Sequence, residues 1–134
     1  MRPIFHLSFP VRDLAEAIAF YQDELGAEIG RREPAFADAL LFGAQVTLQN
    51  DPENVLNPMP RTRHFGATIP WSQWEAIAER VGKAANLVEP PCVSYAGTPA
   101  EQAKLMLKDP SGNLIGVKAY RQPENVLGML ARPQ

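Results

Sequence analysis

The chain has 134 residues, the size of one ordinary domain, and its 46% hydrophobic and 21% charged residues are typical of a folded globular protein. A net charge of −2 argues against nucleic-acid binding, and no apolar run approaches the ~20 residues of a membrane span. A single cysteine excludes an internal disulfide framework and a cysteine-rich zinc site. We therefore expect a cytoplasmic protein with no nucleic-acid or membrane partner.

The first fifty residues predict a strand, a helix and three further strands. Residues 5–10 alternate between apolar and polar side chains, as a half-buried strand does. A helix follows, with an apolar stripe at helical spacing, and Asp13 and Glu16 have the spacing of a capping box. The next segments, 27–33, 36–42 and 44–50, have the length of strands.

Residues 51–62 form a linker rich in proline and asparagine, after which the same order of elements begins again. A strand opens at His64, and Ser72 and Glu75 suggest a second capping box. Strands are predicted at 87–94, 103–108 and 113–120, and the last two flank an Asp-Pro-Ser-Gly-Asn turn at 109–113. A short helix at 124–130 is expected in the tail.

The two halves resemble each other in detail. His6 and His64 each open a strand, and the letters Glu-Ala-Ile-Ala recur in both helices, at 16–19 and 75–78. Such a repeat predicts an α+β fold, with two tandem βαβββ modules forming a curled mixed sheet around a cup-shaped cavity. We expect one domain over residues 1–134: module one at about 4–50, the linker at 51–62, module two at about 63–120, and a C-terminal tail at 121–134.

Strand alternation predicts which side chains face the cavity, because successive residues of a strand point to opposite faces. In the first strand Phe5, Leu7 and Phe9 share the face expected to pack under the helix, while His6 and Ser8 share the other. The same rule applied to the other strands gives a polar set of moderate charge, as in small-molecule sites. This set is His6, Ser8, Gln45, Thr47, Gln49, His64, Gly66, Thr68, Gly116 and Lys118.

The tandem pattern, the histidine-containing strand openings and the 109–113 turn resemble the vicinal oxygen chelate superfamily. That superfamily includes lactoylglutathione lyases, extradiol dioxygenases and bleomycin-resistance proteins. The resemblance spans about residues 4–120 and implies a homodimer. In metal-dependent members, the first-strand His, the fifth-strand His and a last-strand Glu bind the metal. The two histidines correspond to His6 and His64, but the carboxylate position holds Gly116, and the matching position in the first half holds Thr47.

The resemblance therefore implies two alternatives. In the first, His6 and His64 bind a divalent ion (Fe, Mn, Ni or Zn), which chelates a small oxygenated substrate of a dioxygenase-like or lyase-like enzyme. The remaining polar residues would bind the substrate: Ser8, Gln45, Thr47, Gln49, Thr68 and Lys118. In the second, no metal binds, and the protein holds a small molecule as bleomycin-resistance proteins do. Glu101 is the nearest acidic substitute in the chain. Cys92 is expected to be either a small buried hydrophobe or an inert thiol in a loop.

Overall fold

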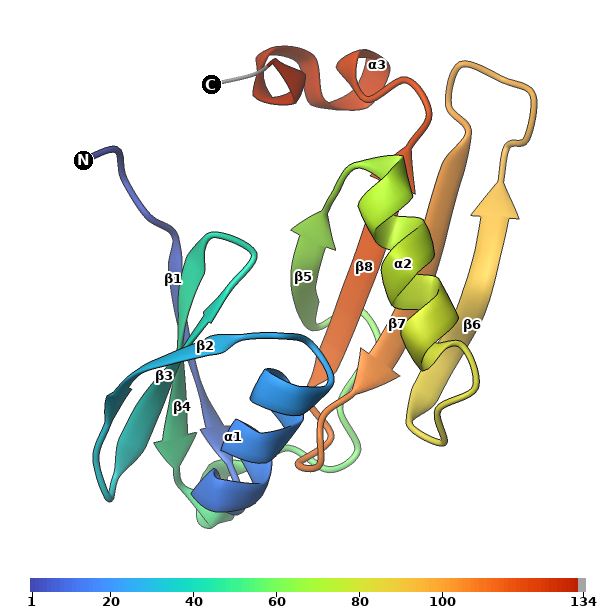
Figure 1. The fold of residues 1–134 in the computed structure, drawn as a ribbon. Coiled ribbons are helices and arrows are strands. Elements are labelled where there is room, and N and C mark those ends of the chain that lie inside the picture. The colour runs from blue at the N-terminus through green and yellow to red at the C-terminus, as the bar shows by residue number, and fades with distance from the viewer. Residues whose placement is uncertain (133–134) are drawn as a thin grey trace. The chain divides into compact units, whose positions relative to one another are not determined.

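The computed structural model describes residues 1–132, which form two compact units (Figure 1). The first unit contains residues 1–63 together with 108–114, and the second contains 64–107 and the chain from 115 onward. The 108–114 turn, which was expected in module two, belongs to the first unit. The single domain over 1–134 stays a prediction, and its last two residues lie outside the described part of the chain.

The first unit has the predicted βαβββ order. Its strands form a four-stranded sheet in the order β1-β4-β3-β2, in which β1 runs parallel to β4 and the other neighbours are antiparallel. The elements are β1 (His6–Val11), α1 (Leu14–Asp23), β2 (Glu28–Arg32), β3 (Phe36–Leu41) and β4 (Ala44–Asn50), followed by a 3₁₀ turn at Pro52–Asn54.

The second unit repeats this arrangement with the strand order β5-β8-β7-β6. Its elements are β5 (His64–Thr68), α2 (Trp71–Val81), β6 (Leu87–Ser94), β7 (Gln102–Lys108) and β8 (Leu114–Tyr120), then α3 (Glu124–Leu127) and a 3₁₀ turn at Gly128–Ala131. The matching order confirms the α+β fold of two modules. The mixed sheet consists of two separate, open four-stranded sheets. Within residues 1–132, no helix combines the length and the apolar character that crossing a membrane requires.

Helix α1 packs against β2, β3 and β4 and buries Ala17, Ile18 and Tyr21. The Asp13 half of its predicted capping box is confirmed, because the backbone N–H of Glu16 donates a 2.9 Å hydrogen bond to Oδ1 of Asp13. The Glu16 carboxylate instead accepts from the Arg12 guanidinium. The second cap is wrong. Helix α2 begins at Trp71, directly after Pro70, and its first turn receives no side-chain cap.

Two other expectations are wrong. Phe5 is 71% exposed, because β1 begins only at His6 and the residue before it does not reach the core under α1. Cys92 is exposed on β6, an edge strand of its sheet, so the expectation of a buried residue is wrong, while the inert thiol stays a prediction. An edge strand has a neighbour on one side only, which leaves more of its side chains open to solvent.

The turn at 109–113 is the centre of a buried polar cluster in the first unit. Asp109, only 2% exposed, accepts hydrogen bonds from the Tyr21 hydroxyl, the backbone N–H groups of Ser111 and Asn113, and the Asn113 amide, all between 2.8 and 2.9 Å. Oγ of Ser111 accepts from the Arg12 backbone N–H at 2.9 Å. Beyond reversing the chain, the motif therefore supplies buried acceptors to the first unit.

Candidate functional site

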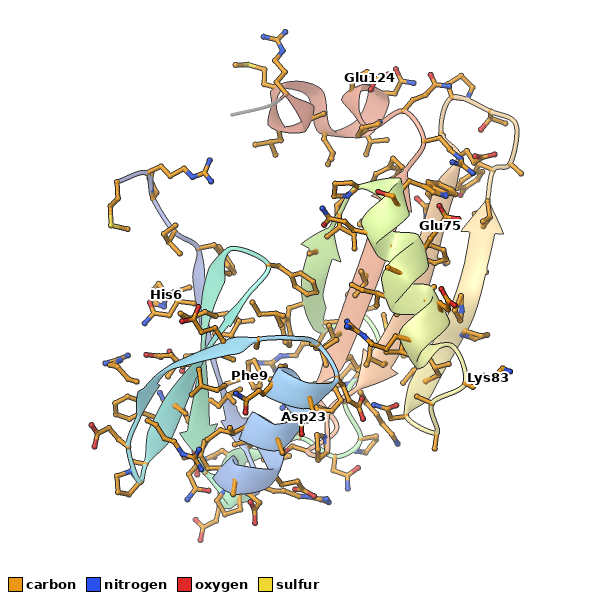
Figure 2. All side chains as sticks on the ribbon, in the orientation of Figure 1. His6, Phe9, Asp23, Glu75, Lys83 and Glu124 are labelled. Carbon is orange, nitrogen blue, oxygen red and sulfur yellow. The ribbon has the colours of Figure 1, made fainter. Side chains whose placement is uncertain are left out.

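The first unit has a hollow of about 360 Å³ beside β1 and β4. In the strand register His6 pairs with Gln45, and Ser8 pairs with Thr47. Alternation places His6 away from the core, whereas the ring of Phe9 lies near α1, 6.3 Å from that of Tyr21 (Figure 2). The hollow is lined by His6, Ser8, Arg31, Gln45, Thr47 and Gln49, which are all the cavity residues predicted for this half plus Arg31.

Two hydrogen bonds determine what this hollow can offer to a ligand. Oγ1 of Thr47 donates to Oδ1 of Asp38 at 2.7 Å, so its hydrogen is committed and its oxygen can only accept. Oγ of Ser8 accepts from Nε2 of Gln49 at 3.1 Å, which leaves the Ser8 hydroxyl hydrogen to donate. The hollow therefore presents an acceptor at Thr47 and a donor at Ser8, which are neighbours on adjacent strands.

Arg31 and Asp38 are the residues of this region that sequence reasoning missed. Nε of Arg31 donates to Oδ2 of Asp38 at 2.6 Å, Nη2 donates to Oδ1 at 3.3 Å, and the guanidinium lies 4.7 Å from the Phe36 ring centre. The hydrogen bond from Arg31 is the main reason why the pKa of Asp38 lies below its usual value; that from Thr47 lowers it further, while burial opposes both.

A signal for Asp38 was present in the sequence. It is the only charged residue of β3, whose sequence is Phe-Ala-Asp-Ala-Leu-Leu, and its neighbours Ala37 and Ala39 are fully buried. An acid in the middle of an apolar strand requires a partner, because an unpaired buried charge is costly. Alternation along this strand places the Asp38 side chain on the face of the sheet that points away from the helix. Thr47, its partner in the register of β3 with β4, lies beside it there.

The second unit has a hollow of about 210 Å³ beside β5 and β8. The backbone N–H of Ile69 donates to the Lys118 carbonyl at 2.8 Å, which ties the end of β5 to β8. Lys118 is exposed, and its Nζ lies 5.7 Å from the ring centre of Tyr120. The lining consists of His64, Phe65, Gly66, Ala67, Thr68, Gly116 and Lys118.

Gly116 lies directly beside His64. A Cβ atom built on Gly116 would lie 3.2 Å from Cδ2 and 3.6 Å from Nε2 of the imidazole. A Cβ on Gly66 would instead overlap the carbonyl oxygen of Gly116, so the backbones of β5 and β8 approach too closely for a side chain there. The carboxylate position of the family pattern is thus adjacent to the histidine that the pattern requires, although this chain has no side chain at that position.

Glu101 does not line this hollow. Its carboxylate accepts a 2.8 Å hydrogen bond from the backbone N–H of Gly97 and a 2.9 Å bond from Nε of Arg121. The pKa of Glu101 lies below its usual value, mainly because of the hydrogen bond from Gly97 and secondly because of that from Arg121. Glu101 is therefore committed to the loop before β7.

The donors present fit only part of the ligand set that the family pattern implies. His6 lines the hollow of the first unit and His64 that of the second, so each hollow contributes one imidazole. Within residues 1–132, no group of three or more His, Cys, Asp and Glu side chains is arranged to hold a metal ion. Two imidazoles suit nitrogen-preferring ions such as Zn²⁺ or Ni²⁺, but the two-histidine, one-carboxylate set lacks its anion.

Comparison with known proteins identifies the family. Residues 4–117 match the family model of the Glyoxalase/Bleomycin resistance protein/Dioxygenase superfamily. A solved structure of a glyoxalase/bleomycin resistance protein/dioxygenase from Alicyclobacillus acidocaldarius is similar to the chain, with 27% identity, a TM-score of 0.77, and coverage of 92% of this chain and 96% of that one.

Two further structures share the fold at lower identity. The fosfomycin resistance protein FosX from Listeria monocytogenes is 17% identical, with a TM-score of 0.73 and coverage of 94% of this chain and 99% of that one. Lactoylglutathione lyase from Agrobacterium tumefaciens is 21% identical, with a TM-score of 0.63 and coverage of 87% and 92%. The repeated modules, the two histidine-containing hollows and the match over residues 4–117 agree, and the chain belongs to the Glyoxalase/Bleomycin resistance protein/Dioxygenase superfamily.

Proposed function

We propose that the protein binds a small oxygenated molecule through a divalent metal ion held by His6 and His64. The observation that carries this proposal is the equivalence of the two histidines. Each is the first residue of the first strand in its unit, each is exposed, and each lines a hollow next to the strand that ends its module. A repeat that keeps an exposed imidazole at both equivalent positions is better explained by a shared ligand than by packing.

The missing carboxylate favours a particular class of ligand. With Gly116 in place of an acid, two neutral imidazoles leave the charge of a divalent ion uncompensated by these protein ligands. A substrate with an anionic oxygen would supply that charge, and a second oxygen beside it would help to complete the coordination. The metal, when bound, supplies Lewis-acid polarisation of those oxygens, as in the dioxygenase-like and lyase-like chemistries of the superfamily.

The chain's own polar groups would orient the ligand. In the first hollow the Thr47 oxygen accepts and the Ser8 hydroxyl donates, with Gln45 and Gln49 beside them. In the second, Thr68 and Lys118 supply a hydroxyl and an ammonium group. These six residues would bind substrate rather than metal.

A second candidate function is metal-free binding of a small molecule, as in bleomycin-resistance proteins. The specific observation that favours it is the position of the His64 ring, which lies against Gly116 where the family carboxylate would stand. A ring in that position can serve as a wall of a ligand pocket without binding metal.

Metal analysis separates the two candidates. The protein should be prepared without a polyhistidine tag, because the chain contains only two histidines and a tag would obscure them. After chelator treatment and its removal, anaerobic titration with Fe²⁺, Mn²⁺, Ni²⁺ and Zn²⁺ is followed by calorimetry and by the NMR signals of the two imidazoles. We expect stoichiometric binding of at least one ion, lost in both His6→Gln and His64→Gln.

The matched control is Cys92→Ser, because Cys92 is an exposed thiol and thiols bind Zn²⁺ and Ni²⁺ readily. Binding that survives this change but not the histidine changes supports the proposed site. If none of the four ions binds, the metal-dependent function is wrong. Turnover of a ligand that is lost in His6→Gln would in turn contradict the metal-free function.

We also propose that the protein is a cytoplasmic homodimer. Symmetric dimers are the commonest soluble oligomers, and an exposed thiol is compatible with a reducing compartment. Light scattering coupled to gel filtration should give twice the mass of the chain. A monomer at micromolar concentration would contradict the dimer.

A further inference from the structure

The second unit contains another cavity, of about 370 Å³, which the proposed metal site does not use. It lies where β5 leads into α2 and where β8 leads into the C-terminal tail. Its wall is largely apolar and includes Ile69, Pro70, Trp71, Tyr120, Leu127 and Leu130. An apolar cavity of about 150 Å³ is enough to bind benzene, so this one has room for an aromatic ring with a short chain.

The wall of this cavity is held in place by polar contacts at its rim. The Arg121 guanidinium lies 3.7 Å from the Trp71 ring centre and donates to Glu101 at 2.9 Å. The charge of Arg121 is thereby paired, while its stacking fixes the orientation of Trp71. Arg121 consequently acts as part of the wall and is not the group that would attract a ligand's charge.

The tail directs some of its apolar side chains to the cavity and others to solvent. Leu127 and Leu130 line the cavity, although Leu130 is 76% exposed. Val126 and Met129, from the same two turns, are exposed and do not line it. An apolar wall that stays open to solvent gains stability when an apolar group covers it.

The cavity adjoins the His64 hollow. Thr68 lines both of them, and Lys118 of the His64 hollow has its Nζ 5.7 Å from the ring centre of Tyr120, which lines the apolar cavity. Lys118 has no carboxylate partner within residues 1–132. Lys118 therefore places an ammonium group, unpaired among the described carboxylates, at the boundary between a polar hollow and an apolar one.

We infer that the ligand of this protein is an aryl-alkanoate or a similar amphiphilic acid. Its hydrophobic group occupies the apolar cavity, and its carboxylate reaches Lys118 and Thr68 at the edge of the His64 hollow. This inference rests on the proposed function in placing the oxygen-bearing end at His64, and it adds the substrate class. The carboxylate would also supply the anion that Gly116 does not.

Three probes separate the contributions of the two ends. They are 4-phenylbutyrate, butyrate, which lacks the ring, and 4-phenylbutan-1-ol, which lacks the charge. Dissociation constants are measured by NMR titration of the chelator-treated protein, so that no metal is involved. We expect 4-phenylbutyrate to bind at least tenfold more tightly than either other probe. The indole N–H signal of Trp71 should shift, and that of Trp74, which donates to the Val117 carbonyl, should not.

Variants test the assignment of each end. Leu127→Ser should weaken the binding of 4-phenylbutyrate at least fivefold. Met129 is an exposed residue of the same tail, and Met129→Ser should leave that binding unchanged. Lys118→Gln should make the dissociation constants of 4-phenylbutyrate and 4-phenylbutan-1-ol equal, because the carboxylate loses its ammonium partner. Equal affinity for butyrate and 4-phenylbutyrate, or equal loss in the Leu127 and Met129 variants, overturns the inference.

The failure of this inference can be told from failure of the metal site. Leu127→Ser should leave the Zn²⁺ titration unchanged, because Leu127 lines the apolar cavity and not the His64 hollow. A protein that binds Zn²⁺ through its histidines but none of the three probes refutes only the ligand class. A protein that binds 4-phenylbutyrate but no metal refutes only the metal site.

Discussion

The hydroxyl of Tyr21 on α1 donates a 2.8 Å hydrogen bond to Oδ2 of Asp109, a residue 88 positions further along the chain. Both side chains are buried. Burial, followed by the neighbouring charge and hydrogen bond of Asp109, raises the pKa of Tyr21 well above its usual value. The phenol therefore stays protonated and remains a donor over the whole range in which the protein is expected to work.

Replacing this hydroxyl should destabilise the first unit. We predict that Tyr21→Phe lowers the free energy of unfolding by about 1–3 kcal/mol, because a buried carboxylate loses a donor that no water replaces. Urea unfolding followed by circular dichroism measures the change. The control is Tyr120→Phe, whose ring lies near Lys118 and which should stay within about 0.5 kcal/mol of the wild type. Equal effects of the two changes would contradict the role of the buried bond.

The lowered pKa of Asp38 predicts a pH-dependent contribution to stability. Because the folded-state pKa lies below the unfolded value of about 3.9, the contribution is fully present above that value and is lost as pH falls through the folded pKa. Asp38→Asn should therefore lower the free energy of unfolding at pH 7 by about 1–3 kcal/mol. The difference from wild type should be constant down to about pH 5 and shrink below about pH 4.

A double-mutant cycle checks the origin of that effect. Arg31→Gln should destabilise the wild type but have little effect in the Asp38→Asn background, because both changes remove the same ion pair. Additive effects in unfolding experiments would mean that the paired contact does not carry the pH dependence.

The close approach of β5 and β8 makes Gly66 intolerant of substitution. Gly66→Ala places a methyl group on the Gly116 carbonyl oxygen, an atom of the backbone that cannot rotate away. We expect a loss of more than about 3 kcal/mol in the free energy of unfolding, or failure to fold. Gly30→Ala is the matched strand control, because its new methyl group would lie at an ordinary 3.5 Å from Cβ of Asp38. A stable Gly66→Ala protein would show that the strands separate more easily than their geometry implies.

Restoring the carboxylate should strengthen metal binding. Gly116→Glu should raise the affinity for Fe²⁺ or Mn²⁺ about tenfold or more, since an anionic oxygen joins the imidazole ligands. The His64 ring must shift by a few tenths of an ångström to admit the new Cβ, which a side chain can do. Gly116→Gln is the control, because glutamine has nearly the shape of glutamate but no charge. It should give a much smaller gain in metal affinity. Unchanged affinity in the Glu variant would mean that His64 and position 116 do not act on the same ion.

The fold was largely predictable because the repeat and the strand alternation are local signals. The strands at 87–94 and 44–50 begin and end where the spacing predicts them. One error concerns the start of the second helix. Ser72 has the spacing of an N-cap, which would start the helix at Gln73, yet α2 starts two residues earlier, at Trp71, directly after Pro70.

The site was predicted in part. Strand alternation predicted the residues that line both hollows, with few exceptions. It missed Arg31 in the first hollow and Phe65 and Ala67 in the second. Arg31 was not predictable, because its role depends on the ion pair with Asp38 on the neighbouring strand β3. The apolar cavity beside Trp71 was beyond sequence reasoning, since it depends on how the tail returns to α2 and β8.

The membership of the 108–114 turn in the first unit has a consequence for the synthesis of the chain. The buried acceptors for Tyr21 and for the Arg12 backbone come from Asp109 and Ser111, near the end of the sequence. While the ribosome is still making the second module, the first has every one of its strands but not these partners. We therefore expect a nascent chain that ends before residue 108 to remain open to proteases, and to close only when the last hairpin has emerged.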